Sequence, residues 1–166
     1  MAEESEEILS CSHCDAEIKA DDEFCPECGE LFIEEAFCNQ HPTQAAIGVC
    51  IVCALPFCSD CGGRVQDRFL CHAHEMLEIY EGMARVFGTS DSVQIEFAKS
   101  ELETTGLHPF VYSRKSNSTS SGGPDYTLFR AGGDYDGHVI NEFKLMLPCQ
   151  EVVLAQEKLR ELEFIK

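Results

Sequence analysis

Residues 38–74 read CNQHPTQAAIGVCIVCALPFCSDCGGRVQDRFLCHAH, and this stretch decides how the first half of the chain folds. Eight of its cysteines and histidines form four pairs, and two residues separate the members of each pair. That gap lets both side chains of a pair reach one metal ion from a tight turn, and two pairs complete a tetrahedral zinc site. Four pairs therefore predict two zinc ions. The pairs are Cys38 with His41, Cys50 with Cys53, Cys58 with Cys61, and Cys71 with His74.

Spacing alone leaves open which pairs share a metal ion. In a sequential arrangement the first pair joins the second and the third joins the fourth. In a cross-braced arrangement the first pair joins the third and the second joins the fourth. Only four residues separate Cys53 from Cys58, so a tight hairpin would place the two middle pairs back to back. This short gap favours the interleaved arrangement.

The order Cys-x2-His-Pro, Cys-x2-Cys, Cys-x2-Cys, Cys-x2-His resembles a B-box-type zinc finger over residues 37–75. The resemblance implies cross-braced pairing and a small fold of turns, a short hairpin and a little helix. Cys71 stands where the eukaryotic form often has histidine, and His72 lies only two residues from His74. His72 therefore stays an alternative to His74 as the last ligand. The implied sets are Cys38, His41, Cys58 and Cys61 for one zinc ion, and Cys50, Cys53, Cys71 and His74 for the other.

Two further pairs precede this stretch, Cys11 with Cys14 and Cys25 with Cys28, ten residues apart. Gly29 follows the second pair, and glycine tolerates the left-handed conformation that lets backbone amides point at cysteine sulfurs. Residues 11–36 resemble a minimal zinc ribbon, and the four cysteines predict a third zinc ion. Only nine residues separate Cys28 from Cys38, so we expect the two zinc modules to pack together.

Disulfides or buried thiols are the alternative for these cysteines. The first residues, MAEESEEILS, are acidic and polar, unlike a secretory signal, and we expect residues 1–10 to be a disordered acidic tail. Disulfide-rich secreted domains rarely repeat two-residue gaps with histidines. The longest apolar run, residues 45–58, is too short to span a membrane. We therefore expect a cytoplasmic protein that binds three zinc ions per chain and does not enter a membrane.

The chain carries 30 acidic and 12 basic side chains, for a net charge of −18. Residues 1–36 alone hold 13 acidic side chains and one basic side chain. Ten zinc-bound thiolates with three zinc ions would add four more negative charges. Such a surface repels phosphate backbones, so the composition disfavours nucleic-acid binding.

The character of the chain changes after the zinc modules. Apolar residues at helical spacing over residues 76–83 predict a short connecting helix. Residues 84–89 predict a strand. A helix then starts at Asp91, with Gln94 as its capping-box partner, and ends at Gly106. Residues 107–113 predict a second strand, with Pro109 placing it at an edge.

Residues 114–138 form a polar insertion rich in glycine and serine, too long for an ordinary hairpin loop. Residues 142–147 predict a further strand, which Pro148 ends. A helix over residues 149–163 then presents one apolar stripe. Residues 84–166 thus predict an α+β ferredoxin-like domain, with helices on one face of a small antiparallel sheet. The stripe consists of Val152, Ala155, Leu159 and Leu162.

The segments ARVFGTSDSVQIEFAKSELETTGLHPFVY and FKLMLPCQEVVLAQEKLREL resemble a small bacterial family named as prokaryotic signal-transducing proteins. Leu102, Gly106, Pro148 and Ala155 take the positions of that family's pattern. The resemblance implies a role in signalling and carries no catalytic residues. The long insertion departs from the family's short hairpin.

Sequence motifs for phosphate-cradling loops, dinucleotide binding and HExxH metalloproteases are absent. Four-ligand zinc sets leave no open position for water, so the predicted zinc ions are structural. We therefore predict no catalytic residues, no cofactor besides zinc, and a non-enzymatic adaptor or signalling-interaction protein with a protein partner. The alternatives are a nucleic-acid-binding zinc protein, a ubiquitin-ligase-like module and a thiol redox switch. The sequence leaves open the partner and the oligomeric state.

Overall fold

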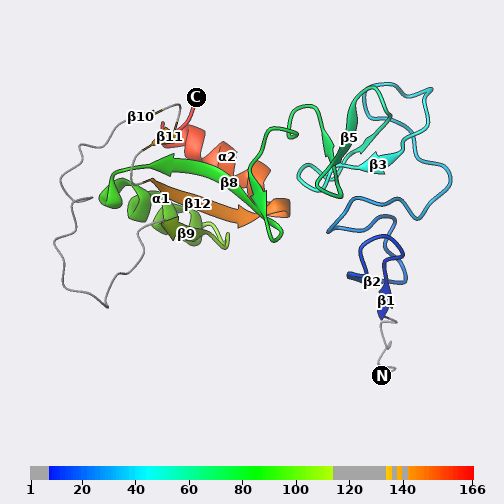
Figure 1. Cartoon of the computed structure of the whole chain (residues 1–166), viewed down its shortest axis with the longest axis horizontal. Helices are drawn as coiled ribbons and strands as arrows, with labels where there is room; N and C mark the ends of the chain where they lie inside the picture. Colours follow the sequence, from blue (N-terminus) through cyan, green and yellow to red (C-terminus); the bar gives the residue numbers. More distant parts are fainter. Residues whose placement is uncertain (1–7, 114–133, 136–137, 140–141) are drawn as a thin grey trace. The chain divides into compact units, whose positions relative to one another are not determined.

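The computed structural model describes residues 8–113, 134–135, 138–139 and 142–166. The chain divides into two compact units, Met1–Leu77 and Glu78–Lys166 (Figure 1). The predicted insertion, residues 114–138, lies outside the described residues except for residues 134–135 and 138. Among the described residues, no helix has the length and apolar character needed to cross a bilayer.

The first unit is built from short antiparallel hairpins. β1 (Ile8–Ser10) pairs with β2 (Glu17–Lys19). β3 (Gly48–Val49) pairs with β4 (Pro56–Phe57), and β5 (Gly62–Val65) pairs with β6 (Arg68–Cys71).

Two expectations for this unit are wrong. Residues 8–10 are not part of a tail, because Leu9 lies opposite Ile18 and the whole of β1 has a partner strand; residues 1–7 lie outside the described residues. The little helix implied by the B-box resemblance is also absent from residues 8–77. Closely spaced metal-ligand pairs hold this part of the chain in turns and in strands of two to four residues instead.

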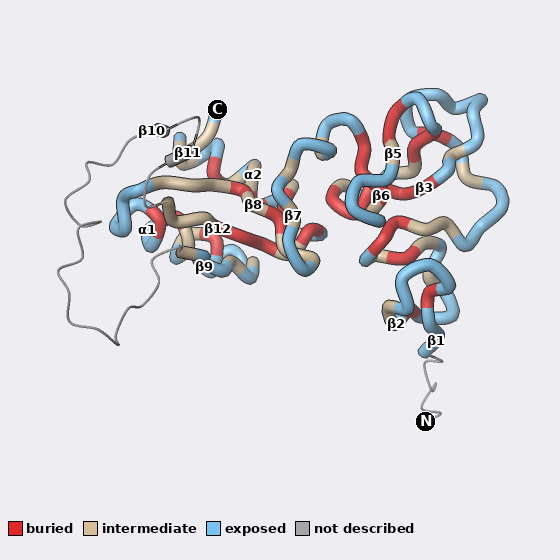
Figure 2. The backbone as a smooth tube through the Cα atoms, in the orientation of Figure 1, coloured by how far each residue is buried: buried red, intermediate tan, exposed pale blue. Residues whose placement is uncertain are grey.

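Phe69 is the centre of the apolar packing in the first unit, and its side chain is fully buried. The buried stretches of this unit include β3 and most of β6 (Figure 2). Glycines form the slot around it: a Cβ on Gly48 would lie 2.5 Å from the Phe69 ring, and one on Gly29 would lie 2.8 Å from the Phe69 Cβ. A larger residue at Gly48 would collide with the ring, and one at Gly29 would collide with the Phe69 Cβ. The slot therefore depends on the absence of side chains at both positions.

Residues 11–36, the predicted zinc ribbon, pack against residues 37–75, as expected from the short connection. The Val49 amide donates to the Gly29 carbonyl oxygen at 2.9 Å, and the Phe69 amide donates to the Cys28 carbonyl oxygen at 2.9 Å. Arg64 adds an ion pair to Glu30 of the ribbon. The two zinc modules are thus joined by backbone hydrogen bonds as well as by side chains.

The second unit is a four-stranded antiparallel sheet in the order β7-β8-β12-β9. The helix α1 (Ser92–Thr104) connects β8 to β9, which lie on either side of β12. After β12 come the 3-10 turn η2 (Cys149–Glu151) and the helix α2 (Val152–Glu161). The strands are β7 (Ile79–Tyr80), β8 (Met83–Thr89), β9 (Phe110–Ser113) and β12 (Phe143–Pro148); β10 (Asp134–Tyr135) pairs separately with β11 (His138–Val139).

Both helices cover the same face of this sheet. They contact each other and both contact β8 and β12. The predicted apolar stripe faces the sheet through Val152, Ala155 and Leu159, whereas Leu162 follows the end of α2 and is half-buried. Both helices pack against β12, whose Leu145 and Leu147 are buried. Among the described residues, no helix lies on the opposite face of the sheet. The buried helical residues are Ile95, Ala98 and Leu102 of α1 and Val152, Ala155 and Leu159 of α2.

The ends of α1 follow the predicted capping chemistry with one change. The Asp91 carboxylate accepts from the Val93 and Gln94 amides. The Gln94 side chain does not return to Asp91; it accepts from the Thr89 hydroxyl, whose oxygen in turn accepts from the Asp91 amide. Gly106 closes the helix at φ +81°.

The connecting helix predicted over residues 76–83 is wrong. Ile79 and Tyr80 form β7 and pair with the start of β8. Glu81 and Gly82 make the two-residue turn, with φ of +47° and +78°. Two successive positive φ angles produce a tight hairpin turn that a helix cannot contain. Pairing along the edge of β8 therefore overrides the helical spacing.

Candidate metal centres

Three groups of four cysteine and histidine side chains come together in the first unit. Within each group all four ligand atoms lie within 4.8 Å of one another. In the stretch 38–74 the first pair meets the third and the second meets the fourth, so the arrangement is interleaved. The groups are Cys11, Cys14, Cys25 and Cys28; Cys38, His41, Cys58 and Cys61; and Cys50, Cys53, Cys71 and His74.

The sulfur separations in the ribbon fit a zinc ion. Zinc–sulfur bonds of about 2.3 Å at tetrahedral angles place two sulfurs about 3.8 Å apart. The Sγ atoms of Cys11 and Cys28 are 3.8 Å apart, and those of Cys14 and Cys25 are 3.6 Å apart. The four thiols thus already have the spacing that a tetrahedral ZnS4 centre needs.

The two mixed groups also fit. A zinc–nitrogen bond of about 2.0–2.1 Å places the nitrogen about 3.5 Å from each sulfur. His41 Nδ1 lies 3.5 Å from Cys58 Sγ and 3.2 Å from Cys61 Sγ. His74 Nδ1 lies 3.5 Å from Cys50 Sγ and 3.2 Å from Cys71 Sγ. Both histidines would bind zinc through Nδ1.

The structure also separates the two candidate last ligands. His74 belongs to the third group, whereas His72 is exposed and does not. The backbone amide of His72 donates to the Cys61 carbonyl oxygen at 3.0 Å. This bond extends the pairing at the end of the β5–β6 hairpin. The imidazole of His72 lies outside the group.

Three of the turns that hold the metal ligands share the same backbone conformation. The residue after the second cysteine has a positive φ: Asp15 at 59°, Gly29 at 77° and Ala54 at 55°. Its amide donates to the carbonyl oxygen of the first cysteine, at 2.9, 2.8 and 2.8 Å respectively. This turn aims both thiols of a pair to the same side. In the first turn the His13 amide also donates to Cys11 Sγ at 3.4 Å.

Ala54 adopts this left-handed conformation at a cost that glycine avoids. We expect Ala54→Gly to stabilise the zinc-loaded chain by about 1 kcal/mol, because the left-handed region costs an L-residue roughly 1–2 kcal/mol. The measurement is the free energy of unfolding by denaturant at fixed free zinc. Ala73→Gly is the control, since Ala73 lies outside the positive-φ region and should lose about 0.5–1 kcal/mol. An equal decrease in the free energy of unfolding for Ala54→Gly and Ala73→Gly would contradict the prediction.

Hydrogen bonding prepares one thiolate in the third group. The Cys53 thiol donates to Cys50 Sγ, and backbone amides add to this, so the pKa of Cys50 falls to about 4. The same bond raises the pKa of Cys53, which has to give up its proton for metal to bind. The lowered pKa of Cys50 favours the thiolate form that zinc binding requires.

All three groups are closed four-ligand sets. Most of the ligands are buried, while Cys14 and His41 are exposed. Four protein ligands fill a tetrahedral zinc ion and leave no position for water, which is the arrangement of structural sites. The chemistry that zinc would supply here is the crosslinking of turns, with binding energy coupled to folding.

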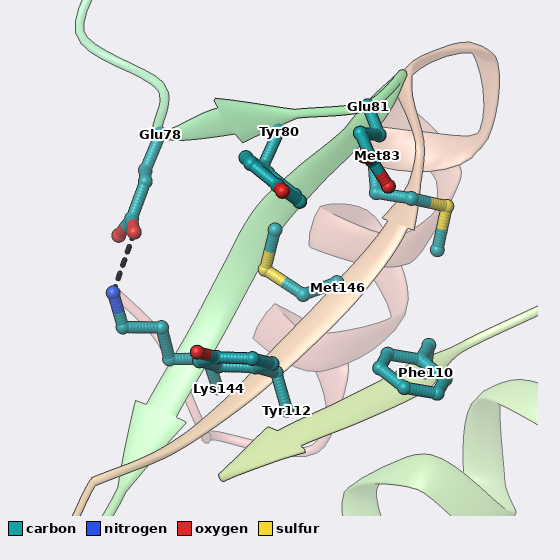
Figure 3. Close-up of a pocket in the computed structure, with 8 residues that line it drawn as sticks. All are labelled: Glu78, Tyr80, Glu81, Met83, Phe110, Tyr112, Lys144 and Met146. Carbon is teal, nitrogen blue, oxygen red and sulfur yellow. Dashed lines mark hydrogen bonds and ion pairs between the residues drawn. The ribbon is translucent and has the colours of Figure 1, made fainter. Parts of the chain in front are cut away.

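One further group of side chains was not predicted as a site. It lines a pocket of about 440 Å³ on the helix-free face of the second unit's sheet (Figure 3). The signal in the sequence was the alternation in two strands, Phe110 with Tyr112 and Lys144 with Met146. The lining residues are Glu78, Tyr80, Glu81, Met83, Phe110, Tyr112, Lys144 and Met146.

Comparison with known protein families gave a match over the segment that holds the first group of cysteines. The family model of the zinc-ribbon domain matches residues 7–32, which contain the whole first group of cysteines. Comparison with curated proteins and with solved structures gave no match. The chain thus contains a zinc-ribbon domain, and it has three cysteine and histidine sites that fit three zinc ions.

Proposed function

We propose that this chain is a non-enzymatic adaptor that binds a protein partner and keeps its shape with structural zinc. The observation that carries the proposal is the closure of all three metal groups, each with four protein ligand atoms. A zinc ion without an open position neither activates water nor polarises a substrate. Its contribution is to hold a small surface rigid.

The exposed apolar side chains of the first unit support a binding role. Ile47 and Leu55 flank the β3–β4 hairpin, and both are exposed, as is Phe37. Large apolar residues on a surface that zinc holds rigid are the kind of anchor around which protein interfaces form. The excess of acidic residues argues against a phosphate backbone as the partner.

The finer assignments belong to the same proposal. The interleaved zinc groups support a B-box-type finger, although its helix is absent. The sheet order β7-β8-β12-β9, with α1 linking strands on either side of β12, supports a ferredoxin-like arrangement in which β7 takes the remaining edge. We propose that the second unit belongs to the prokaryotic signal-transducing family, on the resemblance of its two sequence segments and with this strand order as support. The ten metal-binding thiols suit a reducing compartment such as the cytoplasm.

The adaptor role is tested by capturing partners from reducing extracts of the source cells with the full zinc-loaded chain. The double variant Ile47→Asp with Leu55→Asp should lose at least about 90% of a specific partner, since truncating or charging an interface anchor costs more than about 1–2 kcal/mol. Leu154→Asp is the control, because Leu154 is equally exposed but lies on α2 of the second unit. Equal recovery of every partner with both variants would contradict docking through the zinc modules.

A further inference from the structure

The helix-free face of the second unit's sheet is hollowed into the pocket seen in Figure 3. Its volume of about 440 Å³ lies within the range of small-ligand sites. It is formed by residues of β7, β8, β9 and β12, together with Glu78 and the turn residue Glu81. A site built mainly on strands holds its side chains in fixed relative positions.

Strand register explains why these side chains share a face. Phe110 lies opposite Met146 and Tyr112 lies opposite Lys144. Alternate residues of a strand point to one side of the sheet. Lys144 and Met146 point into the pocket (Figure 3). Leu145 and Leu147 alternate with them, are fully buried and accordingly face the helices.

Aromatic rings form the walls of the pocket. Tyr80 is 69% exposed, Phe110 58% and Tyr112 47%. Figure 3 shows Met146 between the rings of Tyr80 and Tyr112, as the floor. Aromatic faces carry negative potential and attract ammonium groups, and the thioether of methionine is polarisable and adapts to a ligand's shape.

The charged groups on this face leave it negative. Lys144 Nζ lies 2.5 Å from Glu78 Oε1, and this hydrogen bond lowers the pKa of Glu78. Arg85 pairs with Glu142 and also with Glu78, at 3.5 Å. Both cations are therefore already neutralised.

Glu81 adds an uncompensated charge at the rim. The described residues give its carboxylate no ion-pair partner, and with Glu78 and Glu142 it makes three acidic groups against two basic ones. A carboxylate at the rim and aromatic walls inside together favour a ligand that is cationic and partly apolar, and they disfavour anions.

We propose that this pocket binds a small free organic cation that carries an alkylated ammonium group. The alkyl groups contact the rings of Tyr80 and Tyr112 and the Met146 thioether, and the positive charge faces the rings and the carboxylate of Glu81. This site goes beyond the adaptor role, because it makes the second unit a ligand-binding module. A protein partner would then bind the ligand-bound and ligand-free forms with different affinities. Its test does not depend on the zinc modules.

Methionine methyl groups report on the pocket directly. The chain has four methionines, of which Met83 and Met146 line the pocket, while Met76 is 90% exposed and is not among the lining residues. The full zinc-loaded chain, labelled at the methionine methyls, is titrated with choline chloride and followed by NMR. The Met83 and Met146 signals should shift saturably, and the Met76 signal should not. The neutral isostere 3,3-dimethyl-1-butanol should bind at least about fivefold more weakly.

Variants separate the ring and charge contributions. Tyr80→Leu and Tyr112→Leu should each weaken choline binding about fivefold, and Glu81→Gln should weaken it about two- to fivefold. Phe32→Leu, in the first unit, is the matched aromatic control and should leave affinity unchanged. If a tyrosine variant unfolds, the choline-to-isostere ratio of the wild-type chain decides alone.

Three results would overturn binding of an alkylated ammonium group in this pocket, and a fourth would overturn its assignment to a free small molecule. The first is equal affinity for choline and its neutral isostere. The second is full choline affinity in a folded Tyr112→Leu variant, and the third is the absence of any shift at Met83 and Met146. A trimethyllysine peptide that binds at least about tenfold more tightly than choline would overturn the assignment to a free small molecule.

Discussion

Removal of zinc is expected to unfold residues 8–77 and to leave residues 78–166 folded. Cysteines make up about half of the buried apolar residues of the first unit, and in the ribbon three of them and Ile18 form the buried cluster. Structural zinc contributes roughly 10–16 kcal/mol of apparent binding free energy in small fingers, far more than such a core supplies. The second unit has an apolar core between its sheet and helices that contains none of the three metal groups.

Hydrogen exchange read by mass spectrometry checks this result. Chelator under reducing conditions should abolish amide protection across the hairpins β3–β4 and β5–β6 while protection of α1, α2 and β12 persists. Adding zinc back should restore the lost protection. Retention of the first unit's protection in chelator would show that its fold does not depend on metal.

A single substitution should remove one ion. Cys71→Ser is expected to reduce zinc from three ions per chain to two, because Cys71 belongs to the third group. Cys149→Ser is the matched control, since Cys149 is equally buried but belongs to none of the groups. Elemental analysis of both variants gives the stoichiometry. Three zinc ions retained by Cys71→Ser would contradict the assignment of the group.

Gly29→Ala is expected to separate the ribbon from the rest of the first unit at a cost of about 3 kcal/mol or more. Gly29 has φ +77°, and a Cβ there would lie 2.1 Å from the Val49 carbonyl oxygen. That neighbour is backbone and cannot rotate away. The substitution would also break the hydrogen bond from the Val49 amide to Gly29. Strain and collision therefore act together at one position.

Gly63→Ala is the control for this substitution, because nothing lies within 4 Å of a Cβ at Gly63. It should change the free energy of unfolding by less than about 0.5 kcal/mol. Exchange of the Val49 and Phe69 amides, which bridge the two modules, measures the separation. Gly29→Ala should accelerate both while zinc stays at three ions per chain. Unchanged exchange at these amides would contradict the role assigned to Gly29.

Much of the structure could be predicted from the sequence because it depends on interactions between residues that are close together in the chain. A two-residue gap lets both members of a pair bind one metal ion. The spacing alone therefore predicted the ligand pairs of the ribbon and of residues 38–74. In the same way, Asp91 and Gly106 satisfy backbone groups of neighbouring residues, and the stripe from Val152 to Leu159 follows from helical period alone. These features depend on residues within a few positions of one another, and the sequence therefore predicts them.

Contacts between distant residues settled the rest. The interleaving of the pairs depends on how hairpins cross in space, and spacing could only favour it. Tyr80 joins a strand because the edge of β8 lies free beside it, against the helical period of its own segment. The slot around Phe69 requires Gly29 and Gly48 to meet it from separate turns. The pocket arises because the helices cover one face of the sheet and leave rings of β7 and β9 uncovered on the other, a juxtaposition that no local pattern contains.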